Sequence, residues 1–202
     1  MGIAIVSGFG LGFLVAAEVG PIWLLCVRTS ARFGFRPGAA VGAGAATVDT
    51  LYAALGIAGA TALLRIDALR ISLGLAGAVV LALIAARTLW NAFRIRNGGE
   101  VVEEVATPTR AYLTAVVATA SNPLTIASWA AIFSAASVAG LAAAPLLMGV
   151  AAGSATWFAL LAGISAAAGR RASPRALRVV DIVAGVGLAG FAGVLGIRAL
   201  RS

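Results

Sequence analysis

The sequence predicts an all-α integral membrane protein with six transmembrane helices, and three observations support this. Of the 202 residues, 61% are hydrophobic and only 11% are charged, which leaves too little polar surface for a soluble domain. The basic residues lie mostly between long apolar runs. Windows of roughly 20 residues or more, enough to cross a hydrocarbon core, occur at 3–27, 38–64, 68–90, 111–138, 141–167 and 178–198.

The first window is interrupted near its centre by Glu18, Gly20 and Pro21. A proline inside a spanning helix removes a backbone hydrogen bond and kinks the helix. Non-helical backbone at membrane depth is tolerated only where it is buried in protein or lines a water-filled cavity. A carboxylate at that depth is a functional candidate. We therefore expect a broken first helix beside a binding site.

The chain looks like two copies of a three-helix unit, residues 1–90 and 111–202, joined by a cytoplasmic linker at 91–110 within one transmembrane domain of residues 1–202. Gly20-Pro21 in the first window is matched by Asn122-Pro123 in the fourth, and 68–70 and 176–178 share the sequence Ala-Leu-Arg. A unit of three spans enters the membrane from opposite sides when it is repeated. The pattern predicts an inverted repeat, with broken helices 1 and 4 marking the binding site.

The distribution of charge predicts the orientation. Most of the 15 basic residues fall in the first, third and fifth connections. The positive-inside rule then puts these connections in the cytoplasm and both termini outside. We expect the first connection to carry Arg28, Arg32 and Arg36 ahead of a Pro37-Gly38 break, and the fifth to surround Pro174.

Three acidic residues lie within the predicted spans. Glu18 is a candidate proton or cation site. The alternative is a structural hydrogen bond to backbone groups left without a helical partner around Pro21. Asp49 is a candidate for contacting a substrate ammonium group or carrying a coupling proton; alternatively it makes an interhelical hydrogen bond. Asp181 lies about one turn inside the sixth span, and we expect a local ion pair with Arg178 at the cytoplasmic interface.

Polar backbone completes the predicted substrate site. Breaks at Gly20-Pro21 and Asn122-Pro123 would turn amides and carbonyls toward a central cavity, where they suit the carboxylate and ammonium groups of a zwitterion. Tyr52 and Trp157 are candidates for the cavity wall, although aromatic residues in spans more often serve packing or the interface belt.

Three pairs of glycines and one series predict close helix contacts. Gly8 and Gly12 are four residues apart in the first span, as are Gly38 and Gly42 in the second and Gly149 and Gly153 in the fifth. Gly187, Gly190, Gly193 and Gly196 recur every third residue in the sixth. Such spacing of small residues lets the backbones of membrane helices approach each other.

Several motifs occur in a characteristic order: Gly8-x-Gly10-x-Gly12, Val19-Gly20-Pro21, a glycine series from Gly34 to Gly44 with Asp49 five residues on, Asn122-Pro123, and Trp157-Phe158. In this order the sequence resembles the LysE/RhtB superfamily of amino-acid exporters over nearly its whole length. The resemblance implies six spans in two inverted halves and proton-coupled efflux of amino acids or related small solutes. Glu18 is not part of the family pattern, and many relatives have proline in place of Val19.

We therefore expect a secondary active transporter that exports an amino acid or similar small zwitterion across the bacterial cytoplasmic membrane by proton antiport. The expected partners are this solute, protons and the bilayer; a homodimer stays open. We expect no enzymatic activity, cofactor, resident metal or nucleic acid, because histidine is absent, Cys26 is the single cysteine, and the arginines do not line one face with aromatics. Two alternatives remain: a divalent-metal exporter of the same superfamily, and a non-transporting membrane assembly protein.

Overall fold

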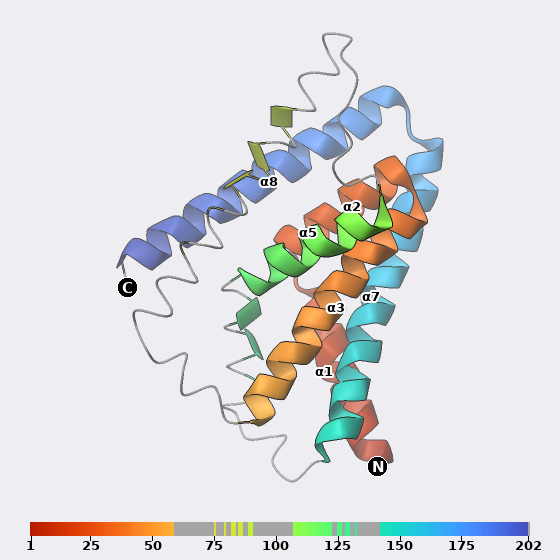
Figure 1. Ribbon diagram of the computed structural model, residues 1–202. Coiled ribbons are helices and arrows are strands. Elements are labelled where there is room, and N and C mark those ends of the chain that lie inside the picture. Colours follow the sequence, from red (N-terminus) through yellow and green to blue (C-terminus); the bar gives the residue numbers. More distant parts are fainter. Residues whose placement is uncertain are drawn as a thin grey trace.

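The computed structural model describes residues 1–58, 107–122 and 142–201, with isolated helical positions between 75 and 90 and between 125 and 132. In these residues all regular structure is helical, and the longer helices pack side by side (Figure 1). The helices are α1 (Gly2–Ala17), α2 (Pro21–Phe33), α3 (Phe35–Ile57), α5 (Pro108–Ala120), α7 (Ala143–Arg171) and α8 (Pro174–Arg201).

Four of the predicted spans have a counterpart in this helical arrangement. Three helical segments are long and apolar enough to cross a membrane: Phe35–Ile57, Ala143–Arg171 and Pro174–Val194. A fourth counterpart is the bent pair α1 and α2, whose axes meet at 79°. The break in the first span is thus confirmed. Most of the predicted span at 68–90 and most of the linker at 91–110 lie outside the described residues. Helix α5 supplies the first part of the fourth window.

Prolines begin three of these helices, which explains where the elements start. Pro21, Pro108 and Pro174 are the first residues of α2, α5 and α8. The first amides of a helix have no intrahelical acceptor, so a residue without an N–H group costs nothing there. The Thr107 and Ser173 hydroxyls cap α5 and α8 by accepting hydrogen bonds from backbone amides in the first turns.

The predicted first connection is wrong in its extent. Arg28 and Arg32 lie on α2, Pro37 lies in the first turn of α3, and the connection is Gly34 alone. Gly34 has φ 89°, a left-handed conformation that favours glycine and lets α2 end abruptly. Pro37 causes no break because the first turn of a helix accommodates proline.

Helices α1 and α7 pack through the glycines predicted for close contact. A Cβ atom at Gly8 would collide with the backbone of Leu146, and one at Gly12 with that of Val150. Gly149 and Gly153 face the α1 backbone in the same way. The prediction is confirmed for these two pairs, whereas a Cβ at Gly190 or Gly193 of the sixth span would meet nothing within 4 Å. Because Gly8 lies against Leu146 and Gly12 against Val150, α1 and α7 run in the same direction.

Helix α3 runs in the opposite direction to α7, because Gly42 lies against Phe158 whereas Asp49, further along α3, bonds to the earlier residue Ser154. Helix α5 runs with α3. The Tyr112 hydroxyl donates to Thr47 Oγ1 at 3.2 Å, and the Tyr52 hydroxyl donates to the Ala120 carbonyl at 2.6 Å. The helices from the first and fourth windows therefore run oppositely, as do those from the second and fifth.

The glycine contact between α1 and α7 should control stability. Gly153→Ala would press a methyl group into the backbone of Phe9 and Phe13, and we expect a loss of about 1–3 kcal/mol, typical of overpacking. Gly163→Ala is the matched control on the same helix, since a Cβ there meets nothing within 4 Å. It should be neutral or stabilise the helix by up to about 1 kcal/mol. Thermal unfolding in detergent measures both, and equal stability of the two variants would contradict the prediction.

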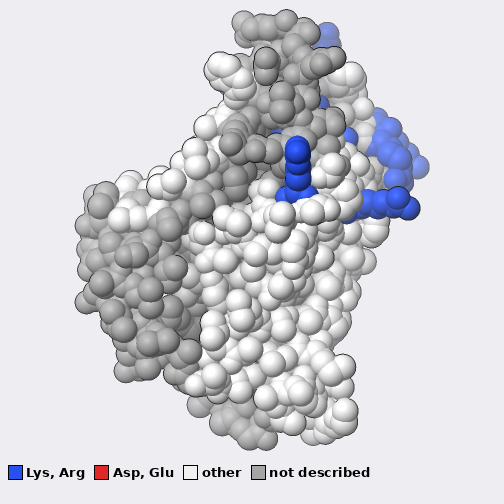
Figure 2. Space-filling model, in the orientation of Figure 1, with Lys and Arg blue, Asp and Glu red and all other residues white. Residues whose placement is uncertain are grey.

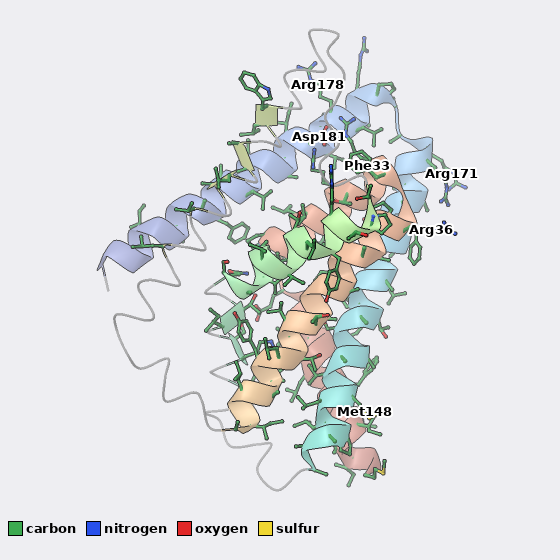
Figure 3. The ribbon with its side chains drawn as sticks, viewed as in Figure 1. Phe33, Arg36, Met148, Arg171, Arg178 and Asp181 are labelled. Atoms are coloured by element: carbon green, nitrogen blue, oxygen red, sulfur yellow. The ribbon has the colours of Figure 1, made fainter. Side chains whose placement is uncertain are left out.

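Arginine side chains gather at one end of the molecule. Figure 2 shows them in the upper part of the view, most of them on one side, while the rest of the described surface in this view is uncharged. Figure 3 places Arg36 and Arg171 at this basic end and Met148 near the N-terminus at the other end. The first and fifth connections therefore share one side of the helix bundle.

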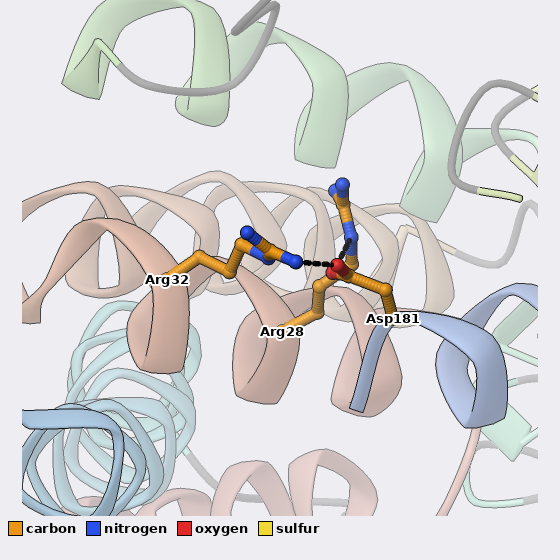
Figure 4. Close-up of polar contacts among 3 residues, drawn as sticks. All are labelled: Arg28, Arg32 and Asp181. Carbon is orange, nitrogen blue, oxygen red and sulfur yellow. Dashed lines mark hydrogen bonds and ion pairs between the residues drawn. The ribbon is translucent and has the colours of Figure 1, made fainter. Parts of the chain in front are cut away.

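The predicted ion pair of Asp181 with Arg178 is wrong. Asp181 on α8 is fully buried and pairs with two arginines of α2: Arg28 Nε donates to Oδ1 at 3.0 Å, and Arg32 Nη2 donates to Oδ2 (Figure 4). The local spacing suggested a partner one turn away, but α2 brings two guanidinium groups directly over the carboxylate. The ion pairs therefore tie the second half of the broken helix to α8.

Candidate functional site

Two helix ends meet in the interior of the bundle. Between α1 and α2 the chain is extended at Gly20, with φ −148° and ψ −170°, and α2 starts at Pro21. Helix α5 stops at Ala120, followed by Ser121 and then Asn122. The helix is thus interrupted at both predicted positions, although Pro123 itself lies outside the described residues.

A cavity of about 40 Å³ lies between these helix ends. Five of the predicted site residues line it, from three separate parts of the sequence: Glu18, Gly20, Pro21, Asp49 and Asn122. The remaining wall is formed by Val15, Ala16, Ile22, Trp23, Ala45, Thr119, Thr125 and Phe158. The described wall contains two carboxylates and no basic side chain.

Asp49 is held in a fixed position on α3, with 3% of its surface exposed. Its Oδ2 accepts a hydrogen bond of 2.7 Å from the Ser154 hydroxyl on α7, and its Oδ1 accepts one of 3.1 Å from the Trp129 indole Nε1. Neither donor carries a charge. The carboxylate is therefore oriented by neutral groups and has no basic partner in the part of the chain that the structure describes.

Glu18 and Asn122 lie on the two opposite breaks. Glu18 is exposed, and both of its carboxylate oxygens are within 3.1–3.2 Å of the Ser128 hydroxyl. Asn122 is buried, and its Nδ2 donates to Thr125 Oγ1 at 3.0 Å. Both residues are thus tied to the helical positions that follow the α5 break.

Tyr52 and Trp157 do not line the cavity. The Tyr52 hydroxyl binds the Ala120 carbonyl and so holds the end of α5 against α3. Trp157 packs edge-on against Phe13, with ring centroids 5.1 Å apart. Its neighbour Phe158, one residue further along α7, lines the cavity instead, together with Trp23 of α2.

Three residues at the site were missed by the sequence analysis. Ser154 and Trp129 orient Asp49, and Thr119 lies in the cavity wall with a buried hydroxyl that has no hydrogen-bond partner. Small polar residues are common in membrane helices, so neither Ser154 nor Thr119 stands out in the sequence. The structure identifies Ser154 as a site residue because it bonds to Asp49, and Thr119 because it lines the same cavity as Asn122.

A family model of LysE type translocators matches residues 13–199, which is nearly the whole chain. The chain belongs to this family. No curated protein sequence and no solved structure gives a significant match. Membership makes the protein a multi-pass membrane translocator, and the cavity between its two broken helices is the candidate path for the solute.

The geometry of the translocator's cavity limits what can happen there. A water molecule needs about 10–15 Å³ of such a space, so the cavity holds about three waters and a solute would require the helix ends to separate. Among the described residues, no three His, Cys, Asp or Glu side chains lie close enough together to hold a metal ion. They therefore offer no ligand cluster that would favour the alternative of a divalent-metal exporter.

Proposed function

We propose that this translocator exports an amino acid or similar small zwitterion across the bacterial cytoplasmic membrane in exchange for protons. The observation that carries the proposal is the cavity shared by both helix breaks and by two carboxylates. In secondary transporters, discontinuous helices near the membrane midplane present backbone groups of complementary charge to the solute. The basic end of the bundle is assigned to the cytoplasm and the N-terminus to the outside.

The start of α2 suits the carboxylate of the solute. The first bond closing this helix runs from the Leu24 amide to the Gly20 carbonyl. The amides of Ile22 and Trp23 therefore precede the intrahelical ladder, and both residues line the cavity. A helix N-terminus also carries partial positive charge. An anionic group can bind there without a basic side chain.

The opposite wall suits the ammonium group. Asp49 supplies a negative charge held by Ser154 and Trp129. The C-terminal end of α5, with its partial negative charge, closes the cavity near Asn122. A zwitterion bridging the two helix ends would find each of its charges opposite a complementary group.

The same acids are proposed to couple transport to protons. Asp49 and Glu18 line one cavity without a basic residue in its described wall, so a proton and a substrate ammonium would compete for the same carboxylates. The opposite directions of corresponding helices support an inverted repeat, whose halves rock about the central site. Proton entry from outside would then reset the acids after the solute leaves.

Cells fed with dipeptides provide the test, because peptide hydrolysis loads the cytoplasm with amino acids. Mass spectrometry of cells and medium should show one or a few amino acids falling inside and rising outside only when the protein is present. In everted membrane vesicles, a proton gradient should drive uptake of the same solute, and an uncoupler should abolish it. Unchanged pools with the protein confirmed in the membrane would refute amino-acid export.

A bulky side chain at Gly20 should block transport without preventing folding. The extended backbone at Gly20 suits any residue, and a Cβ there meets only the Glu18 carbonyl oxygen, at 3.9 Å. Gly20→Leu would fill the cavity, and export should fall to the level of cells lacking the protein. Gly20→Ala is the control and should fold and retain activity. Normal export by Gly20→Leu would show that the solute passes elsewhere.

A further inference from the structure

The interface of α2 and α8 contains more positive than negative charge. We define the α2–α8 cluster as Arg28, Arg32, Arg178 and Asp181. Both oxygens of Asp181 are already used, one by Arg28 and one by Arg32. One carboxylate thus faces two guanidinium groups, and Arg178 adds a third one turn earlier on α8 (Figure 3).

Two guanidinium groups of the cluster have unused donors. The Nε atoms of Arg32 and Arg178 are buried and have no hydrogen-bond partner. A buried donor without an acceptor is costly, more so when it belongs to a charged group. The other acids in the described chain, Glu18 and Asp49, line the cavity instead. Among the described residues, no acidic side chain is therefore left to accept from these two donors.

The antiparallel packing of α2 and α8 places Arg178 on the side of Asp181 toward which Arg32 lies. Asp181 lies at the level of Arg28 and Arg32, and further along α8, Gly187 faces Leu24 of α2. Moving one turn back from Asp181 along α8 brings Arg178 toward the Arg32 end of α2. Guanidinium groups suit phosphate and carboxylate oxygens, which accept several N–H bonds at once.

The neighbouring surface of α8 is apolar and exposed. Val179, Val183 and Val186 are 58%, 57% and 59% exposed, and their spacing puts them on one face of the helix. In a helical-wheel projection of α8, Arg178 lies between this valine face and the side of the helix that carries the buried Asp181. A ligand with an anionic head and long apolar chains matches both features.

We propose that the α2–α8 cluster binds the phosphate group of an anionic phospholipid, with its acyl chains lying along the valine face of α8. The site lies at the basic end of the bundle, the end assigned to the cytoplasm, where anionic headgroups attract basic pockets between membrane helices. The headgroup supplies the acceptors that Arg32 and Arg178 lack. This site is separate from the cavity and does not depend on which solute is exported.

The test compares the full-length protein in nanodiscs of phosphatidylcholine alone and of phosphatidylcholine with phosphatidylglycerol. Phosphatidylglycerol should raise the melting temperature by about 5–10 °C, the shift expected for a ligand at about one hundred times its Kd. Arg178→Gln should lose most of this shift, and Arg178→Lys, which keeps the charge without the guanidinium Nε, should recover only part. Native mass spectrometry should show retained phosphatidylglycerol on the unmodified protein and not on Arg178→Gln.

Exposed arginines at the same end provide the controls. Arg171→Gln and Arg175→Gln should keep the shift; an equal loss in these variants would reduce the effect to general surface charge and overturn the proposal. Inorganic phosphate added to phosphatidylcholine discs should not reproduce the shift, and a full shift would assign the site to a free anion. The absence of any shift in the unmodified protein would also overturn it.

Discussion

Asp49→Asn is expected to abolish export while leaving the protein inserted and folded. The amide can keep both contacts of the carboxylate, because its oxygen accepts from Trp129 and its nitrogen donates to the Ser154 hydroxyl, which accepts as well as donates. It can neither balance a substrate ammonium group nor carry a proton. Solute release from loaded cells and proton-driven uptake into everted vesicles should both fall to background.

The matched control for Asp49→Asn is Thr50→Val on the same helix. The Thr50 hydroxyl donates to the Ala46 carbonyl of its own helix at 2.7 Å and does not line the cavity. This variant should export normally at the same membrane abundance. Full export by a folded Asp49→Asn protein would leave Asp49 with a structural role only and remove the main support for proton coupling through α3.

Asp181→Asn is expected to cause the largest loss of stability. The substitution leaves Arg28 and Arg32 buried without a counter-charge, and breaking a buried ion pair in this way typically costs about 3–5 kcal/mol. Reversible unfolding in mixed micelles would measure the change in the free energy of unfolding. A loss below about 1 kcal/mol would be typical of an exposed pair and would contradict the buried geometry.

A triple variant separates charge from packing in this cluster. Arg28→Met, Arg32→Met and Asp181→Leu together remove all three charges and retain apolar volume. Replacement of a buried ion network by apolar residues is often neutral or stabilising, so the triple variant should recover most of the stability lost in Asp181→Asn. Its failure to recover would show that these side chains contribute through shape and contacts beyond their charge.

The sequence was sufficient to predict a helical membrane protein, the break before Pro21 and the glycines of α1 and α7 that allow close helix contact. These features follow from local composition and spacing, which hydropathy and small-residue patterns report directly. The position of Asp49 and Asn122 at one cavity was also predictable. Asp49 is an acidic residue in the middle of a predicted span, and Asn122 is a polar residue at a predicted helix break. Their convergence is a tertiary feature, but the repeat pattern indicated it.

Other parts of the site depend on contacts that sequence spacing does not report. Asp181 was assigned to Arg178 because they are one turn apart, whereas helix packing gave it two partners from α2. Ser154 orients Asp49 across a sequence separation of 105 residues. Phe158 lines the cavity where Trp157 was expected, since a shift of one residue along α7 turns a side chain by about 100°.

The packing of α1 also has a consequence for how the chain assembles during synthesis. The glycine face of α1 has its partner on α7, which emerges from the ribosome after more than half of the chain has been made. Until then none of the described helices that precede α7 covers this face. Tertiary assembly of the first helix is therefore a late event, and a truncated product ending before α7 would be a substrate for membrane quality control.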